Sequence, residues 1–291
     1  MVLRVLRSRL LAVIAALTAV AVPAVTLPAL PHVSIVPVLI GIVPWVVGKY
    51  VLCPLRWHAL SESGRSRRWH LRAYAESELL GLLTPGHVGA DLWRTRRLSR
   101  LGMHVPTAMA EVGLDRFVGA LGLALFVAMA GAALPTRMLV VALGLAALAV
   151  VAGLVLRRVR PSLLPRRELP RPGRLAHGLV LSLGYQATIA ALLYGTVAAT
   201  GHTVSPLALL GAFGASQIAG AVPGPNGASP RDGALVVALV GLGLPWRAAL
   251  GSVTLMASVA WGPALLLGGT SLLLGHVGAR MRQRAAVSVA T

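Results

Sequence analysis

Long apolar runs dominate this 291-residue chain and leave few folds open to it. Six of the runs are each close to the ~20 residues that an α-helix needs to cross a bilayer. They lie at about residues 10–30, 34–52, 113–134, 138–156, 176–199 and 248–275. Only 12% of the residues are charged, far fewer than in a soluble domain, and a transmembrane β-barrel would show short alternating strands instead. We therefore predict an all-α, polytopic membrane protein, with residues 1–291 forming a single integral membrane domain.

The distribution of arginine predicts how the chain is oriented. The formal net charge is +19, and most arginines lie in stretches that flank the apolar runs. This pattern fits the positive-inside rule better than nucleic-acid binding, so we expect no nucleic-acid partner. It predicts a multi-pass protein of the bacterial inner (plasma) membrane with both termini in the cytoplasm. The first 24 residues also resemble a signal peptide, but we expect an uncleaved first span.

Two shorter apolar stretches are interrupted by helix-breaking residues. With about six full spans, the charge pattern is consistent only if residues 75–92 dip in from the cytoplasm and 206–244 dip in from outside. The later stretch holds a charged loop that begins Pro-Gly-Pro-Asn-Gly, at residues 223–232. Irregular backbone survives at membrane depth only inside protein or beside a watery cavity. We therefore predict two opposed re-entrant hairpins and a binding or transport site near the loop.

The two re-entrant stretches also echo one another in sequence. The first carries Gly81, Pro85, Gly89 and Asp91, and the second carries Gly220, Pro223, Gly227 and Asp232. Paired broken segments of opposite topology are typical of an inverted repeat with a site near the middle of the bilayer.

The charged residues near these stretches allow alternative structural and functional interpretations. Ser229, Pro230 and Asp232 match a capping box, which would start a helix at residue 230 and present free N–H groups to an anion. Asp91 and Arg94, three residues apart, can pair on a helix. The arginines here either hold the cytoplasmic interface or form a funnel for headgroup phosphate: Arg94, Arg96, Arg97 and Arg100. Glu111 and Asp115 would repel one another, and we expect Arg116 and the upstream arginines to compensate them. An intramembrane proton relay is the alternative for these acids.

The chain resembles the flippase-like membrane domain family, also called the lysylphosphatidylglycerol synthase transmembrane family. The resemblance rests on the spacing of Pro223, Pro225, Gly227 and Asp232, on that of Gly81, Pro85, Gly89 and Arg94, and on Asp115-Arg116. The chain departs from the family pattern at Asn226 and Ser229, where Gly is usual, and at Asp232, where Glu is usual. The resemblance implies a protein that moves lipids or lipid-linked sugars across a membrane. Some relatives carry a soluble aminoacyl-transferase domain, which we do not expect here.

These observations predict membrane translocation of an anionic lipid or a polyprenyl-phosphate-linked glycolipid. We expect no enzyme activity, catalytic residue, metal or cofactor. The predicted substrate-binding residues are Pro85, Gly89, Asp91, Arg94, Asp115, Arg116, Pro223, Pro225, Asn226, Gly227, Arg231 and Asp232. One alternative is a non-transporting membrane subunit that scaffolds a partner glycosyltransferase or lipid-modifying enzyme. Another is a membrane-embedded transferase that acts on a lipid phosphate.

Overall fold

The computed structural model describes residues 33–82, 84, 87–129, 170–220 and 229–275, together with a few isolated positions near residues 21–28 and 151–159. Every regular element within these residues is helical. The elements are α3 (Ile35–Val47), η1 (Gly48–Leu52), α4 (Cys53–Leu60), α5 (Arg67–Leu82), α6 (Val88–Ser99), α7 (Val105–Met129), α9 (Pro172–Ala199), α10 (Pro206–Ala219), α11 (Pro230–Gly241), α12 (Trp246–Val259), α13 (Trp261–Pro263) and η4 (Ala264–Gly269). The predicted all-α class is confirmed.

Three continuous helical stretches are long and apolar enough to cross a membrane: Ile35–Leu60, Pro172–Ala199 and Trp246–Gly275. The first and third each contain a short π-helical segment, η1 and η4. The predicted spans at 10–30 and 138–156 lie outside the described residues, and the predicted span at 113–134 overlaps α7. The all-helical membrane fold therefore stands, while the number of six full spans stays a prediction.

One predicted boundary was wrong. The apolar run predicted at about 34–52 ends before Arg56, but the helix continues to Leu60 and Arg56 lies within α4. Arg56 is only 5% exposed, because its guanidinium pairs with Asp115 of α7. A charge that is compensated from a distant helix does not have to end an apolar helix.

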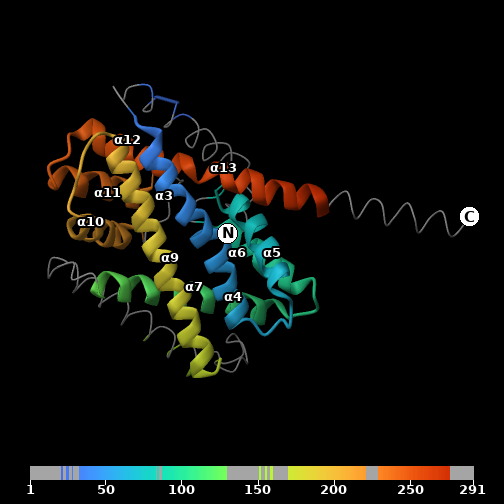
Figure 1. The fold of residues 1–291 in the computed structure, drawn as a ribbon. Helices are drawn as coiled ribbons and strands as arrows, with labels where there is room; N and C mark the ends of the chain where they lie inside the picture. Colours follow the sequence, from blue (N-terminus) through green and yellow to red (C-terminus); the bar gives the residue numbers. More distant parts are fainter. Residues whose placement is uncertain are drawn as a thin grey trace, which may run out of the picture.

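Helix α9 is the centre of the arrangement. It contacts α3, α4, α7, α10 and α12, and in Figure 1 it runs diagonally between the other helices. Glycine permits the closest crossing, since a Cβ on Gly41 would lie 2.9 Å from the carbonyl oxygen of Ala191. A Cβ on Gly195 would lie 2.4 Å from the carbonyl oxygen of Pro37. Small residues of this kind let membrane helices approach closely.

The two interrupted stretches form two helical hairpins. Helix α5 packs against α6, and α10 packs against α11, with the two pairs on either side of α9 in Figure 1. Helices α10 and α11 have 14 and 12 residues. At ~1.5 Å per residue such helices are about 20 Å long, which is short of the ~30 Å hydrocarbon core. Their lengths agree with half-helices, and their depth in a bilayer stays a prediction.

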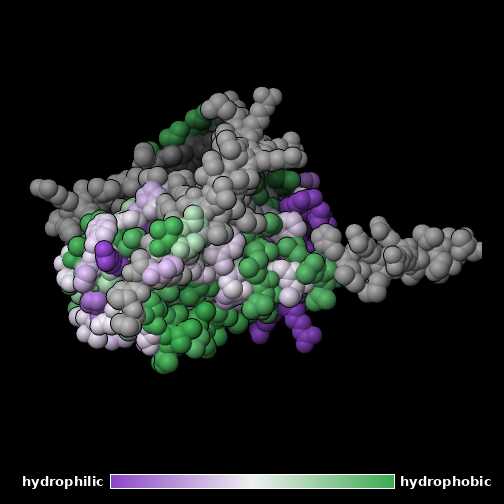
Figure 2. Space-filling view, turned by 90° about the horizontal axis from the view of Figure 1, so that it is seen from above, coloured by the Kyte–Doolittle hydropathy of each residue, from purple (hydrophilic) through white to green (hydrophobic). Residues whose placement is uncertain are grey.

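Exposed hydrophobic side chains cover much of the outer surface. Figure 2 shows a broad hydrophobic area on one face, with the most hydrophilic side chains toward its left and right edges. On α3 alone, Ile35, Val36, Leu39, Ile40 and Val43 are each more than half exposed. A contiguous apolar surface of this size marks a surface that meets lipid or another apolar partner.

Candidate functional site

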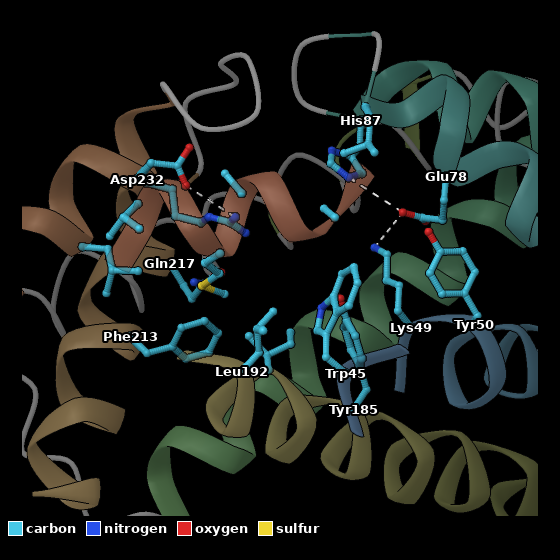
Figure 3. A pocket seen from close by; sticks show the side chains of 18 residues that line it. Trp45, Lys49, Tyr50, Glu78, His87, Tyr185, Leu192, Phe213, Gln217 and Asp232 are labelled. Atoms are coloured by element: carbon cyan, nitrogen blue, oxygen red, sulfur yellow. Dashed lines mark ion pairs between the residues drawn. The ribbon is translucent and has the colours of Figure 1, made fainter. Parts of the chain in front are cut away.

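A cavity of about 100 Å³ lies between the two hairpins. Its walls come from the α3–η1 stretch, α5, α9, α10, α11 and α12, together with His87 (Figure 3). Phe213, Leu192 and Trp45 supply much of the apolar lining. The polar lining comes from both hairpins and from η1, and it includes two cations and two carboxylates. We call this space the central cavity.

An ion pair between Lys49 and Glu78 borders the central cavity on one side. Lys49 Nζ lies 2.8 Å from Glu78 Oε2, and the two side chains are 14% and 5% exposed. The ammonium also lies 5.7 Å from the centre of the Tyr185 ring. His87 Nε2 is 3.8 Å from the same Glu78 oxygen, and Figure 3 shows the Lys49 and His87 side chains converging on that carboxylate. Desolvated charges persist when they are paired in this way.

His87 reaches this position through an unusual backbone conformation. Its φ is 59°, and among the described residues it is the one non-glycine residue with a positive φ. It directly precedes α6, at the turn of the first hairpin. Left-handed backbone at a histidine is uncommon and costs about 1 kcal/mol or more, so the surrounding contacts must hold it there.

The start of α11 borders the opposite side of the central cavity. The predicted capping box is confirmed: Asp232 N donates to Ser229 Oγ, and Ser229 N donates to Asp232 Oδ2 at 3.0 Å. Arg231 lies beside it, with Nη2 3.6 Å from Asp232 Oδ1, and both residues line the cavity. The first turn of α11 therefore brings a guanidinium and the positive end of the helix dipole to one wall of the cavity, a combination that suits an anion.

A separate chain of ion pairs joins α4, α6 and α7. Asp115 accepts from Arg56 Nε at 2.8 Å and from Arg94 Nη1 at 2.7 Å, and it is fully buried. Asp91 accepts from Arg94 Nη2 at 2.6 Å and from Arg116 Nε at 3.0 Å. The predicted pairing of Asp91 with Arg94 is confirmed. None of these five residues lines the central cavity.

The expected compensation of Glu111 and Asp115 is confirmed in part, since the upstream Arg94 pairs with Asp115, but it was wrong for Arg116. Asp115 is compensated by Arg56 and Arg94, whereas Arg116 pairs with Asp91. The carboxylate of Glu111 instead accepts hydrogen bonds from Trp57 Nε1, Ser61 Oγ and the backbone N–H of Glu62. The two acids lie four residues apart on α7 and contact different partners. Each carboxylate is therefore stabilised separately.

The remaining predicted site residues are only partly placed. Gly89 lies in the first turn of α6, where its N–H donates to Thr84 Oγ1 at 2.8 Å and closes the hairpin turn. A side chain at this position would meet Leu80 O and Thr84 Oγ1, each at 2.6 Å. Pro85, Pro223, Pro225, Asn226 and Gly227 lie outside the described residues. Of the predicted set, the structure brings Arg231 and Asp232 to the cavity.

Four polar residues of the cavity were missed from the sequence: Lys49, Glu78, Tyr185 and Gln217. Lys49 did carry a signal, because it is the single lysine in a chain with 27 basic residues and it stands inside an apolar run. A lone lysine in a span marks a place where a compact, desolvated cation is tolerated. Among the described residues, no group of three His, Cys, Asp or Glu side chains could hold a metal ion.

Comparison with known proteins agrees with this architecture. The chain matches the family model described as the lysylphosphatidylglycerol synthase TM region over residues 2–268. No curated protein and no solved structure gave a match. The family is membrane-associated and related to lipid flippase function. The match covers more than half of the chain, includes both hairpins and the central cavity, and confirms the family that the loop motifs had indicated, so this protein belongs to the lysylphosphatidylglycerol synthase TM region family.

Proposed function

We propose that this protein moves an anionic lipid, or a polyprenyl-phosphate-linked glycolipid, across the bacterial inner membrane. The headgroup would pass through the central cavity while the hydrocarbon tail stays in the bilayer. The observation that carries the proposal is the cavity itself, which lies between two short hairpins and is lined by a cation from η1 and another from α11. In this proposal the protein performs no covalent chemistry, and both of its termini face the cytoplasm.

Lys49 and Arg231 are the cations that would meet the phosphate. Each now rests near a carboxylate, Glu78 at 2.8 Å and Asp232 at 3.6 Å. A phosphate entering the cavity would compete with those carboxylates and would also gain from the positive end of the α11 dipole. Arg94 has a different role, since it is 1% exposed and bound to Asp115 and Asp91. Arg94, Asp115 and Arg56 hold the helices in place around the site.

The size of the cavity adds a requirement. Its volume of about 100 Å³ is well below the ~300 Å³ of the smallest typical small-molecule sites. In this proposal the structure corresponds to a closed state, and a headgroup enters only if the hairpins separate. This is the behaviour expected of a transporter whose site opens to one side at a time.

Reconstitution tests the proposal directly. Purified protein in liposomes should move fluorescently labelled phosphatidylglycerol between leaflets faster than protein-free liposomes do, as read by chemical quenching of the outer leaflet. Lys49→Gln and Arg231→Gln should each slow the movement by roughly tenfold or more, because each removes a charge-assisted contact to phosphate. Arg247→Gln, which neutralises an exposed arginine outside the cavity lining, is the matched control and should behave like the wild type.

Two results would overturn the proposal. Liposomes with folded wild-type protein that move no more label than empty liposomes would favour a scaffolding role for the chain. Movement that is equal in the wild type, Lys49→Gln and Arg231→Gln would show that the lipid does not pass through the central cavity.

A further inference from the structure

A second and larger cavity, of about 830 Å³, lies where α4 ends and where α5 and α9 begin. It shares no lining residue with the central cavity. Its residues belong to the basic stretches that the positive-inside rule assigns to the cytoplasmic side. We call this space the basal cavity. It plays no part in the function proposed above.

One part of the basal cavity is strongly basic. Arg65 contributes from the segment that joins α4 to α5, Arg67 from the first position of α5, and Arg174 from the first turn of α9. Within the part of the chain that the structure describes, none of the three guanidinium groups forms an ion pair. The lining residues include one acidic residue, Glu62, compared with three arginines. The cavity therefore has an excess of positive charge that is available to an anion.

The other part of the lining is apolar and lies deeper along the same helices. Leu55 and Ala59 come from one face of α4, and Leu181 comes from α9. Leu181 follows Arg174 by seven residues, which is about two helical turns, or about 10 Å, on the same side of α9. A ligand that fills the cavity thus meets arginine at the surface and hydrocarbon side chains about two turns further in.

His70 marks the inner wall of the basal cavity. It is fully buried, its Nδ1 lies 3.1 Å from the carbonyl oxygen of Ser66, and its Nε2 has no hydrogen-bond partner among the described residues. Burial lowers the pKa of His70 to about 4. The imidazole is therefore neutral near pH 7, its Nδ1–H donates to Ser66, and the positive charge of the cavity comes from the arginines.

We propose that the basal cavity binds the headgroup of an anionic phospholipid from the leaflet that it faces. The arginines would bind the phosphate, and the first carbons of the acyl chains would lie against Leu55, Ala59 and Leu181. Basic cavities between membrane helices at the cytoplasmic surface are suited to anionic headgroups. The volume of about 830 Å³ suits a whole headgroup rather than a bare phosphate. Binding here does not require the protein to transport lipid.

The position of the basal cavity also relates it to the central cavity. On α9, Arg174, His177 and Leu181 line the basal cavity, and Tyr185, Ile189 and Leu192 line the central one. Successive members of this series are three or four residues apart, so they form one stripe along a single helix face. A lipid bound in the basal cavity therefore lies at the end of the stripe that leads toward the central cavity.

Native mass spectrometry of the detergent-solubilised protein with dioctanoyl phosphatidylglycerol tests this site. The triple variant R65Q/R67Q/R174Q should lose one bound lipid, with the dissociation constant for that lipid rising roughly tenfold or more. The matched control R68Q/R96Q/R100Q removes the same charge from exposed arginines outside the cavity and should bind as the wild type does. The Lys49→Gln/Arg231→Gln variant should also keep this lipid, which separates the basal site from the central cavity.

The apolar wall decides between a lipid and a free phosphate. Leu181→Ser should weaken binding of dioctanoyl phosphatidylglycerol and leave binding of glycerol 3-phosphate unchanged. Equal loss of lipid in both triple variants would overturn the proposal, since it would show a general charge effect. Glycerol 3-phosphate that binds the wild type as tightly as the lipid would overturn it as well, because the site would then belong to soluble phosphates.

Discussion

The two hairpins look alike in sequence but are held together by different forces. In the α5–α6 hairpin, the buried side chains Glu76, Glu78 and Arg94 are all paired with other charged groups. In the α10–α11 hairpin, the buried side chains Leu209, Phe213, Leu235, Val236 and Leu239 belong to one hydrophobic cluster shared with α9 and α12. The first hairpin therefore adds a network of directional contacts to its apolar packing, whereas the second depends mainly on apolar packing.

The first hairpin is also tied to the last span. Ser271, two residues after the end of η4, donates to Glu76 Oε1 at 2.9 Å, and Arg97 of α6 reaches the same carboxylate. A Cβ on Gly268 of η4 would lie 2.5 Å from the carbonyl oxygen of Ala75, so the two helices meet closely. A directional network loses most of its stability when one partner is removed, whereas apolar packing loses stability by degrees. The comparison therefore predicts different responses to mutation.

The largest effect is expected from Asp115→Asn, which keeps the size of the side chain but leaves Arg56 and Arg94 without their shared carboxylate. Removing one partner of a buried ion pair costs about 3–5 kcal/mol, and here two guanidinium groups lose theirs. Thermal unfolding in detergent, followed by size-exclusion chromatography, should show a large loss of folded protein. Arg116→Gln removes the half-exposed end of the same chain of ion pairs and should cost about 1 kcal/mol or less. Equal losses in the two variants would contradict the directional character of the first hairpin.

A smaller, graded effect is expected in the second hairpin from Leu239→Ala. Leu239 is 0% exposed in the cluster between α11 and its neighbours, so the change should cost about 2–3 kcal/mol through lost packing and the cavity it leaves. Val237→Ala, at a position 61% exposed on the same helix, is the control and should change the melting temperature little. A loss from Leu239→Ala larger than that from Asp115→Asn would reverse the comparison of the hairpins.

The sequence predicted the contacts that are local along the chain. The all-helical class follows from the apolar runs, and the pairs Asp91–Arg94 and Ser229–Asp232 are each three residues apart, so their geometry is set by one turn of helix. Arg56 and Asp115 are 59 residues apart, and Lys49 and Glu78 are 29 apart. No periodicity links such positions, because their approach depends on how α4, α5 and α7 pack.

The candidate site was predictable to the same extent. Arg231 and Asp232 were found because the loop before them breaks an apolar stretch and a capping pattern follows it. Glu78 and Gln217 lie inside the two predicted re-entrant stretches, but no local pattern links them, and only the folding of both hairpins against α9 brings them to one cavity. Lys49 is the exception, because a single lysine inside an apolar run could be recognised from the sequence. Its pairing with Glu78 could not.

The smallest of the expected effects tests the hydrogen bond between Ser229 and Asp232 that caps α11. Ser229→Ala removes the N-cap hydroxyl that accepts from Asp232 N, so the free energy of unfolding should fall by about 1 kcal/mol. Ser229→Asp keeps an accepting oxygen at the cap but places it beside Asp232, so it should recover part of the melting temperature. Ser258→Ala removes a hydroxyl that bonds within α12 to Thr254 O and should leave the melting temperature nearly unchanged. If Ser229→Ala instead matched the loss expected of Asp115→Asn, the second hairpin would depend on a polar contact as much as the first does, and the contrast between the hairpins would fail.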